Sequence, residues 1–166
     1  MKVNYIKLFF ILFAGLYFFY YAFTPEQWNF IDSANLLVHE AGHWIFSFFG
    51  KTLYIAGGSI LQILIPSIFA LYFFHKKEIY SGSFVLFWVG QNILNVAAYA
   101  GDAVKMNLPL LGGNENVIHD WNFLLSKFSL LPQAEQISGG IKTIGVIIFI
   151  LAVFVGTKVC LKIQNN

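Results

Sequence analysis

The sequence predicts an all-α membrane protein: a polytopic helix bundle of about five transmembrane helices, with one folded loop and a short interfacial helix. Composition is the first reason, because 58% of the 166 residues are hydrophobic and only 11% are charged. Soluble domains keep roughly a quarter of their residues charged. Length is the second reason, because several apolar runs are long enough to cross a bilayer. We expect a single domain covering residues 1–166.

The five predicted spans follow one another with short polar connections. The first follows Lys2, is too long for the apolar core of a signal peptide and has no cleavage site after it, so we expect a retained signal anchor. Asp32 or Ser33 can cap the second span. The third contains Gly57-Gly58 and Pro66, which predict a broken or partly re-entrant helix. The spans cover residues 5–23, 31–50, 53–74, 79–101 and 141–163. An odd number of spans places the two chain ends on opposite faces.

The folded loop lies between the fourth and fifth spans, in a stretch that is neither apolar enough to span nor polar enough for plain disorder. Pro109 and Gly112-Gly113 indicate turns. Residues 121–131 have the pattern of a short amphipathic helix, which we expect at the membrane interface.

Charge and cysteine content exclude several kinds of protein. The net charge of +2 comes from scattered lysines that form no basic stripe, so nucleic acid is not an expected partner. The single cysteine, Cys160, forms no disulfide framework or thiolate metal site, and we interpret it as a packing residue. We expect an integral, multi-pass protein in the cell membrane of a bacterium, with the lipid bilayer as its surroundings.

The pattern HEAGH in the second run is an HExxH motif. On a helix, its spacing places His39 and His43 on one face, where both imidazoles can bind one Zn²⁺ while Glu40 contacts the water on the metal. The competing interpretation is a pair of histidines hydrogen-bonded between helices. An ionisable residue at membrane depth costs about 3 kcal/mol and generally marks function, which favours the metal site.

Helical rise predicts which polar residues lie level with this motif. Counted from Ile31 at about 1.5 Å per residue, His39 and His43 lie about 12 and 18 Å into a core about 30 Å thick. Gln62 and Gln91 reach nearly the same level on the third and fourth spans. Gln91, Asn95 and Asp102 also share one helix face. Hydrogen bonds between helices explain any one of these residues, but together they favour a wet cavity.

A catalytic zinc needs a third protein ligand and an open position for water. The candidates are Asp102, His119 and Asp120. On a straight helix Asp102 lies about 17 Å beyond the level of His43, so a role at the helix end suits it better. His119 and Asp120 follow a loop that is long enough to fold back, and either can reach the metal.

Three parts of the chain resemble the site-2 protease family of intramembrane zinc metalloproteases. These are HEAGH, the Gly57-Gly58 pair before a span with polar residues, and NLPLLGGNENVIHDW, a loosened form of the family's asparagine-proline-leucine-aspartate-glycine segment. The resemblance implies that His39 and His43 are zinc ligands, that Glu40 is the general base and that Asp120 is the ligating aspartate. The extra histidine, the tryptophan after the aspartate and the short chain would make this a compact, diverged member.

The expected function is zinc-dependent hydrolysis of a peptide bond in a membrane protein or peptide substrate. Glu40 would take a proton from the water, and Asn95 or Gln91 would steady the oxyanion. The alternative is a non-catalytic zinc-binding membrane protein that acts as an assembly or regulatory partner and tolerates Glu40→Gln. A di-iron oxygenase is disfavoured because the chain has only four histidines. The oligomeric state is left open.

Overall fold

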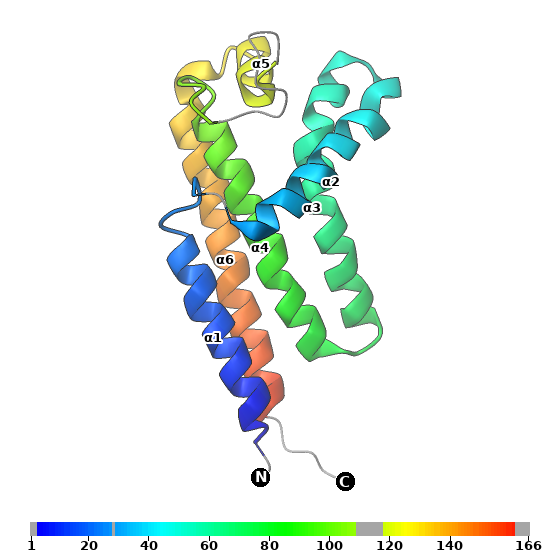
Figure 1. The fold of residues 1–166 in the computed structure, drawn as a ribbon, viewed down its shortest axis with the longest axis vertical. Coiled ribbons are helices and arrows are strands. Elements are labelled where there is room, and N and C mark those ends of the chain that lie inside the picture. Colours follow the sequence, from blue (N-terminus) through cyan, green and yellow to red (C-terminus); the bar gives the residue numbers. More distant parts are fainter. Residues whose placement is uncertain (1–2, 28, 109–117, 162–166) are drawn as a thin grey trace.

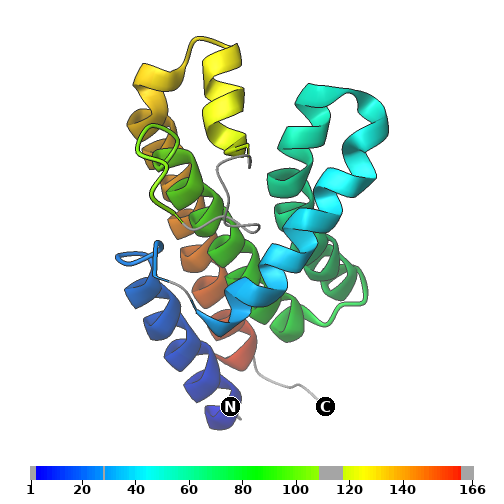
Figure 2. The same cartoon turned by 45° about the horizontal axis from the view of Figure 1, so that its top comes forward.

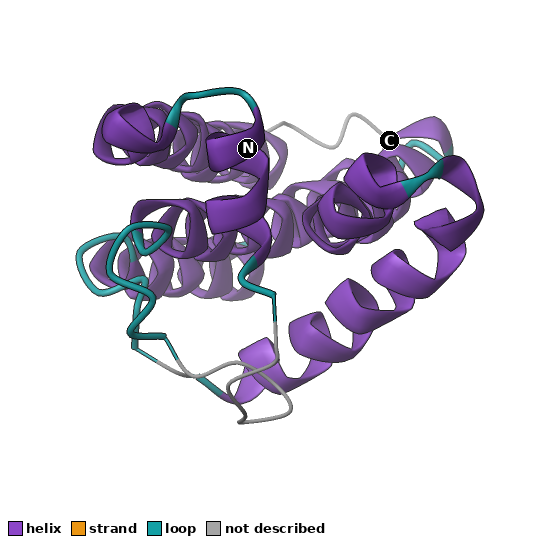
Figure 3. Ribbon diagram, turned by 90° about the horizontal axis from the view of Figure 1, so that it is seen from above, coloured by secondary structure: helices purple, strands orange, loops and turns teal. Residues whose placement is uncertain are grey.

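The computed structural model describes residues 3–27, 29–108 and 118–161, and all regular structure in these ranges is helical (Figure 1). This confirms the all-α prediction. A view from above likewise contains helices and loops but no strand in the described part of the chain (Figure 3). The elements are α1 Tyr5–Tyr21, α2 Phe30–Phe46, α3 Lys51–His75, α4 Ile79–Gly101, α5 Asp120–Lys127 and α6 Ala134–Leu161, with single 3₁₀ turns η1 Ser47–Phe49 and η2 Leu131–Gln133.

Three helical stretches are long and apolar enough to cross a membrane: α3, α4 and the stretch Leu131–Leu161 that contains α6. They support a membrane protein, but the count of five spans is not confirmed. Helix α1 is apolar but has only 17 residues. Helix α2 also has 17 residues, and its buried residues are mostly polar. Of the five predicted spans, the second therefore has the least support, because α2 ends at Phe46 and its buried residues are mostly polar.

The described ends of the chain lie together. Helix α1 begins beside the end of α6, where the Asn4 amide donates to the carbonyl oxygen of Cys160 at 3.2 Å. Figure 1 shows why: α1 and α2 run in the same general direction, and α2 starts only part of the way along the bundle. The prediction of ends on opposite faces is therefore wrong, because α2 does not run back along α1 as the second span was expected to do.

The helices form two groups that meet along α4. Helices α4 and α6 pack side by side, and α1 lies against them (Figure 1). Helices α2 and α3 form a hairpin that contacts α4 mainly through α3 (Figure 2). Aromatic rings fill the first group, with Phe18 stacked on Phe87 at 5.2 Å between centroids and Phe149 packed against both. The short α5 lies over the end of α4 and the start of α6, where Leu125 packs between Ala103 and Ala134.

The glycine pair in α3 serves packing and does not break the helix, which continues through both glycines and through Pro66. A Cβ atom on Gly42 would lie 2.2 Å from the carbonyl oxygen of Gly57, so only hydrogen fits where α2 and α3 meet. A Cβ atom on Gly58 would lie 2.4 Å from Nε2 of His39. The predicted break is wrong because small residues are also what lets two membrane helices approach closely.

Candidate metal centre

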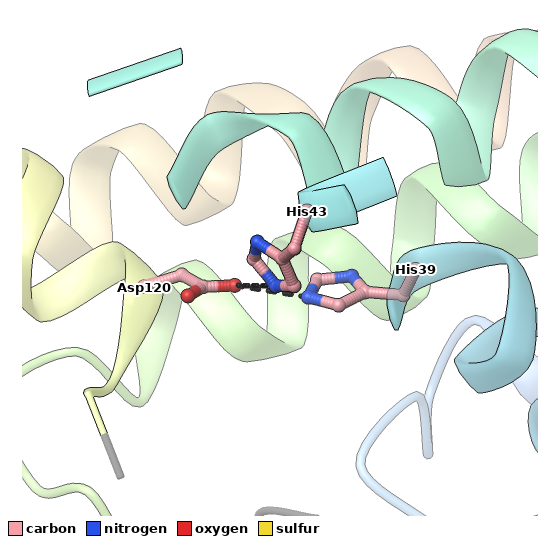
Figure 4. A group of neighbouring side chains, drawn as sticks. All are labelled: His39, His43 and Asp120. Atoms are coloured by element: carbon pink, nitrogen blue, oxygen red, sulfur yellow. Dashed lines mark hydrogen bonds and ion pairs between the residues drawn. The ribbon is translucent and has the colours of Figure 1, made fainter. Parts of the chain in front are cut away.

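Two helices that are distant in the sequence bring His39, His43 and Asp120 together. One ligand atom from each lies within 4.8 Å of the others. Nε2 of His39 is 2.9 Å and Nε2 of His43 is 3.2 Å from the same Asp120 oxygen, Oδ2. The histidines share a face of α2, and Asp120 is the first residue of α5 (Figure 4). Two imidazole nitrogens and one carboxylate oxygen are a usual ligand set for zinc and leave a fourth position open.

The contact of Nδ1 in each imidazole determines whether Nε2, the nitrogen that faces Asp120, carries a proton. Nδ1 of His43 lies 2.8 Å from the backbone carbonyl oxygen of Tyr54, which can only accept, so Nδ1 carries the hydrogen. Nδ1 of His39 lies 2.9 Å from Oε1 of Gln62 and has the same role. If the ring is neutral, Nε2 then has no hydrogen and presents a lone pair to Asp120. Fixing the tautomer through the second nitrogen is the usual way in which proteins orient a metal-binding histidine.

Three groups of like polarity therefore converge at one point. Lone pairs of two imidazoles and a carboxylate oxygen repel one another unless a cation lies between them. An additional proton on each ring would relieve the repulsion, and so would one metal ion. The residues present thus fit zinc by their chemistry and by the direction of their free atoms.

Asp120 is suited to bind a cation because it is held in its charged form. Its residue is only 5% exposed. Burial disfavours the carboxylate, but hydrogen bonds and positive charge from the two imidazoles, when they carry the extra proton that a metal ion would replace, outweigh burial and hold the pKa of Asp120 below its ordinary value. The Asp120 amide also donates to the hydroxyl of Tyr99 at 3.1 Å, which ties the start of α5 to α4.

Asn95 is linked to His39 through Gln62. Its Oδ1 accepts from Nε2 of Gln62 at 2.8 Å, and Gln62 in turn contacts His39. The structure thus links α2, α3 and α4 through His39, Gln62 and Asn95, and of the two residues that the helical rise placed level with the histidines only Gln62 takes part. Gln91 does not join them, because its side-chain nitrogen donates to Asp32 at 2.6 Å and to Tyr21 at 3.3 Å.

His119 and Asp102 lie behind Asp120 and outside the three-residue group. Nδ1 of His119 accepts from the Asn122 amide at 3.2 Å, which caps α5, and Nε2 lies 3.4 Å from Oδ2 of Asp102. Asp102 accepts from the amides of Asn107 and Leu108 just past the end of α4. Of the three candidates for the third ligand, only Asp120 points at both histidines.

Glu40 lies next to His39 on α2 but faces outward. It is exposed, and none of the described residues pairs with its carboxylate. It is close enough for its charge to act on His43.

Sequence reasoning missed the residues that hold α5 in place. Nε1 of Trp121 donates to the Ser59 hydroxyl at 3.2 Å, and Lys127 hydrogen-bonds to Thr52, so α5 is fastened to α3. Tyr99 was also missed, although it follows Asn95 by one turn and extends the polar face of α4. Most of the segment that resembles the asparagine-proline-leucine motif, residues 109–117, lies outside the described residues.

No protein-family model, no curated protein and no solved structure matches this chain. The functional proposal therefore depends on the site and not on the fold.

Proposed function

We propose that this chain is a zinc-dependent intramembrane endopeptidase, a compact and diverged member of the site-2 protease family, in a bacterial cell membrane. The observation that carries the proposal is the convergence of two imidazoles of fixed tautomer and a buried carboxylate, next to the unpaired Glu40. The three candidate spans supply the membrane setting. In this proposal the chain crosses the membrane several times: α1 crosses it in addition to the three candidate spans, and α2 extends only part of the way through it.

His39, His43 and Asp120 are the residues that would hold the zinc. Zinc bound there would lower the pKa of a water molecule toward about 7 and polarise the scissile carbonyl. Gln62 and the Tyr54 carbonyl keep both imidazoles turned so that Nε2 faces the metal. Tyr99 and His119 keep Asp120 at the start of α5, in reach of α2.

We assign the role of general base to Glu40, because it follows His39 in the HExxH motif and its exposed carboxylate is accessible to water. It takes a proton from the attacking water as the water oxygen bonds to the carbonyl carbon. It then passes this proton to the amide nitrogen as the carbon–nitrogen bond breaks, so the products are one carboxylate end and one amine end. A helical substrate must unwind locally first, because its backbone groups are already paired within the helix.

A second function, structural zinc in a non-catalytic assembly partner, is favoured by one specific observation. The histidines belong to the α2–α3 hairpin, whereas Asp120 belongs to α5, which packs on α4 and α6. A metal at this point therefore cross-links the two helix groups and stabilises the fold without any chemistry.

Glu40→Gln separates the two functions, because it removes the base and keeps the ligands. We would purify wild type, Glu40→Gln and the control Glu26→Gln in detergent, then measure zinc content and cleavage of labelled casein and of single-span membrane proteins. Glu26 is exposed and outside the metal group. The proposal expects one zinc in all three proteins and at least about 100-fold slower cleavage in Glu40→Gln alone. Equal cleavage by wild type and Glu40→Gln, or no cleavage by any zinc-loaded protein, would contradict the peptidase proposal and favour structural zinc in a non-catalytic protein.

A further inference from the structure

Building on the proposed peptidase function, we infer that Tyr99 is a catalytic residue that donates a hydrogen bond to the oxyanion formed from the substrate carbonyl. Tyr99 lies on α4, one turn after Asn95, and reaches across to the start of α5. The residue types that usually stabilise an oxyanion include tyrosine.

Tyr99 lies against the metal group. Its hydroxyl is 3.1 Å from the amide nitrogen of Asp120, the residue whose carboxylate meets both histidines. Its ring centroid is 5.9 Å from that of His39 and 4.4 Å from that of His119. The hydroxyl is therefore held beside a ligand residue by packing on both sides.

The hydroxyl has a hydrogen left to donate. A phenol both donates and accepts, and the Asp120 amide occupies its accepting side. Within residues 3–27, 29–108 and 118–161, no acceptor is hydrogen-bonded to the Tyr99 hydrogen. A half-buried donor without a partner is costly, and an oxyanion beside the metal group would satisfy it.

The two side chains of α4 that the sequence favoured for the oxyanion have other partners. Asn95 is joined to Gln62 and so lies one residue behind His39. Gln91 donates to Asp32 and Tyr21 and lies in a separate cluster. Tyr99 is thus a better candidate for the oxyanion than Asn95 or Gln91, the two residues that the sequence favoured.

Tyr99→Phe tests this inference, because it removes the hydroxyl and keeps the ring. Tyr72→Phe is the matched control, since Tyr72 is an exposed tyrosine near the opposite end of α3. The first measurement needs no substrate: each protein is loaded with Co²⁺, and its visible spectrum is titrated with inorganic phosphate, a tetrahedral oxyanion, and with imidazole, a neutral metal ligand. Zn²⁺ affinity is measured by competition with a chelator.

We expect Tyr99→Phe to bind phosphate about 10-fold more weakly, since a hydrogen bond to a charged group is lost. Affinity for imidazole should stay within about 2-fold of wild type. Zn²⁺ affinity should fall by less than the affinity for phosphate, because the Asp120 amide loses its acceptor while the His119 cap of α5 remains. Tyr72→Phe should match wild type throughout. In the cleavage assay, kcat should fall about 100-fold with little change in KM.

Unchanged phosphate affinity in Tyr99→Phe would overturn the inference. So would a loss of Zn²⁺ affinity as large as the loss for phosphate, because Tyr99 would then only position Asp120. Failure of the proposed peptidase function has a different result: Glu40→Gln would cleave as well as wild type, or nothing would be cleaved, while the phosphate titration would still report on Tyr99.

Discussion

Two buried polar clusters lie along the same face of α2, and they differ in whether their hydrogen bonds are complete. The first, which we call the amide cluster, consists of Asp32, Asn35, Trp88 and Gln91. Gln91 donates to Asp32 at 2.6 Å, Asn35 donates to Gln91 at 2.6 Å, and Trp88 donates to Asn35 at 2.8 Å. Each of these bonds pairs a donor with an acceptor.

In the metal group, His39, His43 and Asp120, the contacts on the inner side pair a donor with an acceptor only when the rings carry an additional proton. His39 donates its Nδ1 hydrogen to Gln62, and His43 donates its own to the Tyr54 carbonyl oxygen. In neutral rings, the lone pairs of Nε2 therefore face the Asp120 carboxylate. The two clusters do not differ in burial, because Asp32 is 2% exposed and Asp120 is 5% exposed. The comparison teaches that acceptors facing one another without a donor favour a cation site, whereas a completed network indicates a structural role.

The largest expected effect is the loss of zinc from the double variant His39→Ala/His43→Ala. Wild type should contain one zinc per chain, and the double variant none, because a lone carboxylate binds zinc weakly. Elemental analysis of the purified proteins measures this. Stoichiometric zinc in the double variant would remove the distinction between the clusters.

The next comparison makes the same change in each cluster. Asp120→Ala should lose zinc outright. Asp32→Ala should keep one zinc but lower the free energy of unfolding by about 1–3 kcal/mol, because Gln91 loses its acceptor inside the bundle. Zinc content and thermal melting in detergent measure both effects. Zinc loss from Asp32→Ala at a temperature where it remains folded would contradict the structural role of the amide cluster.

Gly58→Ala should weaken zinc binding without touching a ligand. The added Cβ atom would lie 2.4 Å from Nε2 of His39, so the imidazole must move away from Asp120. We expect about a 10- to 100-fold loss of affinity, similar to the loss of a residue that orients a ligand. Gly139→Ala is the control, because a Cβ atom there meets nothing within 4 Å. An unchanged chelator competition curve for Gly58→Ala would show that His39 has room to move.

The last comparison concerns His119 and Asp102, which lie beside Asp120, and the smallest expected effect is that of Asp102→Ala. His119→Ala should weaken zinc binding about 10- to 100-fold, because it removes the cap of α5 and the ring that packs on Tyr99. Asp102→Ala should leave the affinity nearly intact. Zinc titration of both variants measures which one binds zinc more weakly. Normal binding by Asp120→Ala together with loss in His119→Ala would exchange the roles of these neighbours.

Local features were predictable from the sequence because they depend on neighbouring residues. The fourth helix was predicted at residues 79–101, and α4 has these bounds, since an apolar run between polar ends fixes both helix and length. The spacing of HEAGH placed His39 and His43 on one face for the same reason. The helical rise also predicted that Gln62 lies level with the histidines, and the two residues are in contact.

Contacts between distant segments were decided only in the tertiary structure. The sequence by itself determined an all-α membrane protein with two histidines and a glutamate on one helix. The loop before His119 and Asp120 can fold back in many ways, so the residue pattern left both in reach of the metal, and only the family resemblance favoured Asp120. The packing of α5 on α3, α4 and α6 brings Asp120, and not His119, to the two histidines. The glycine pair shows the same limit: glycine permits both a break and a close approach, and which one occurs depends on whether another helix arrives there.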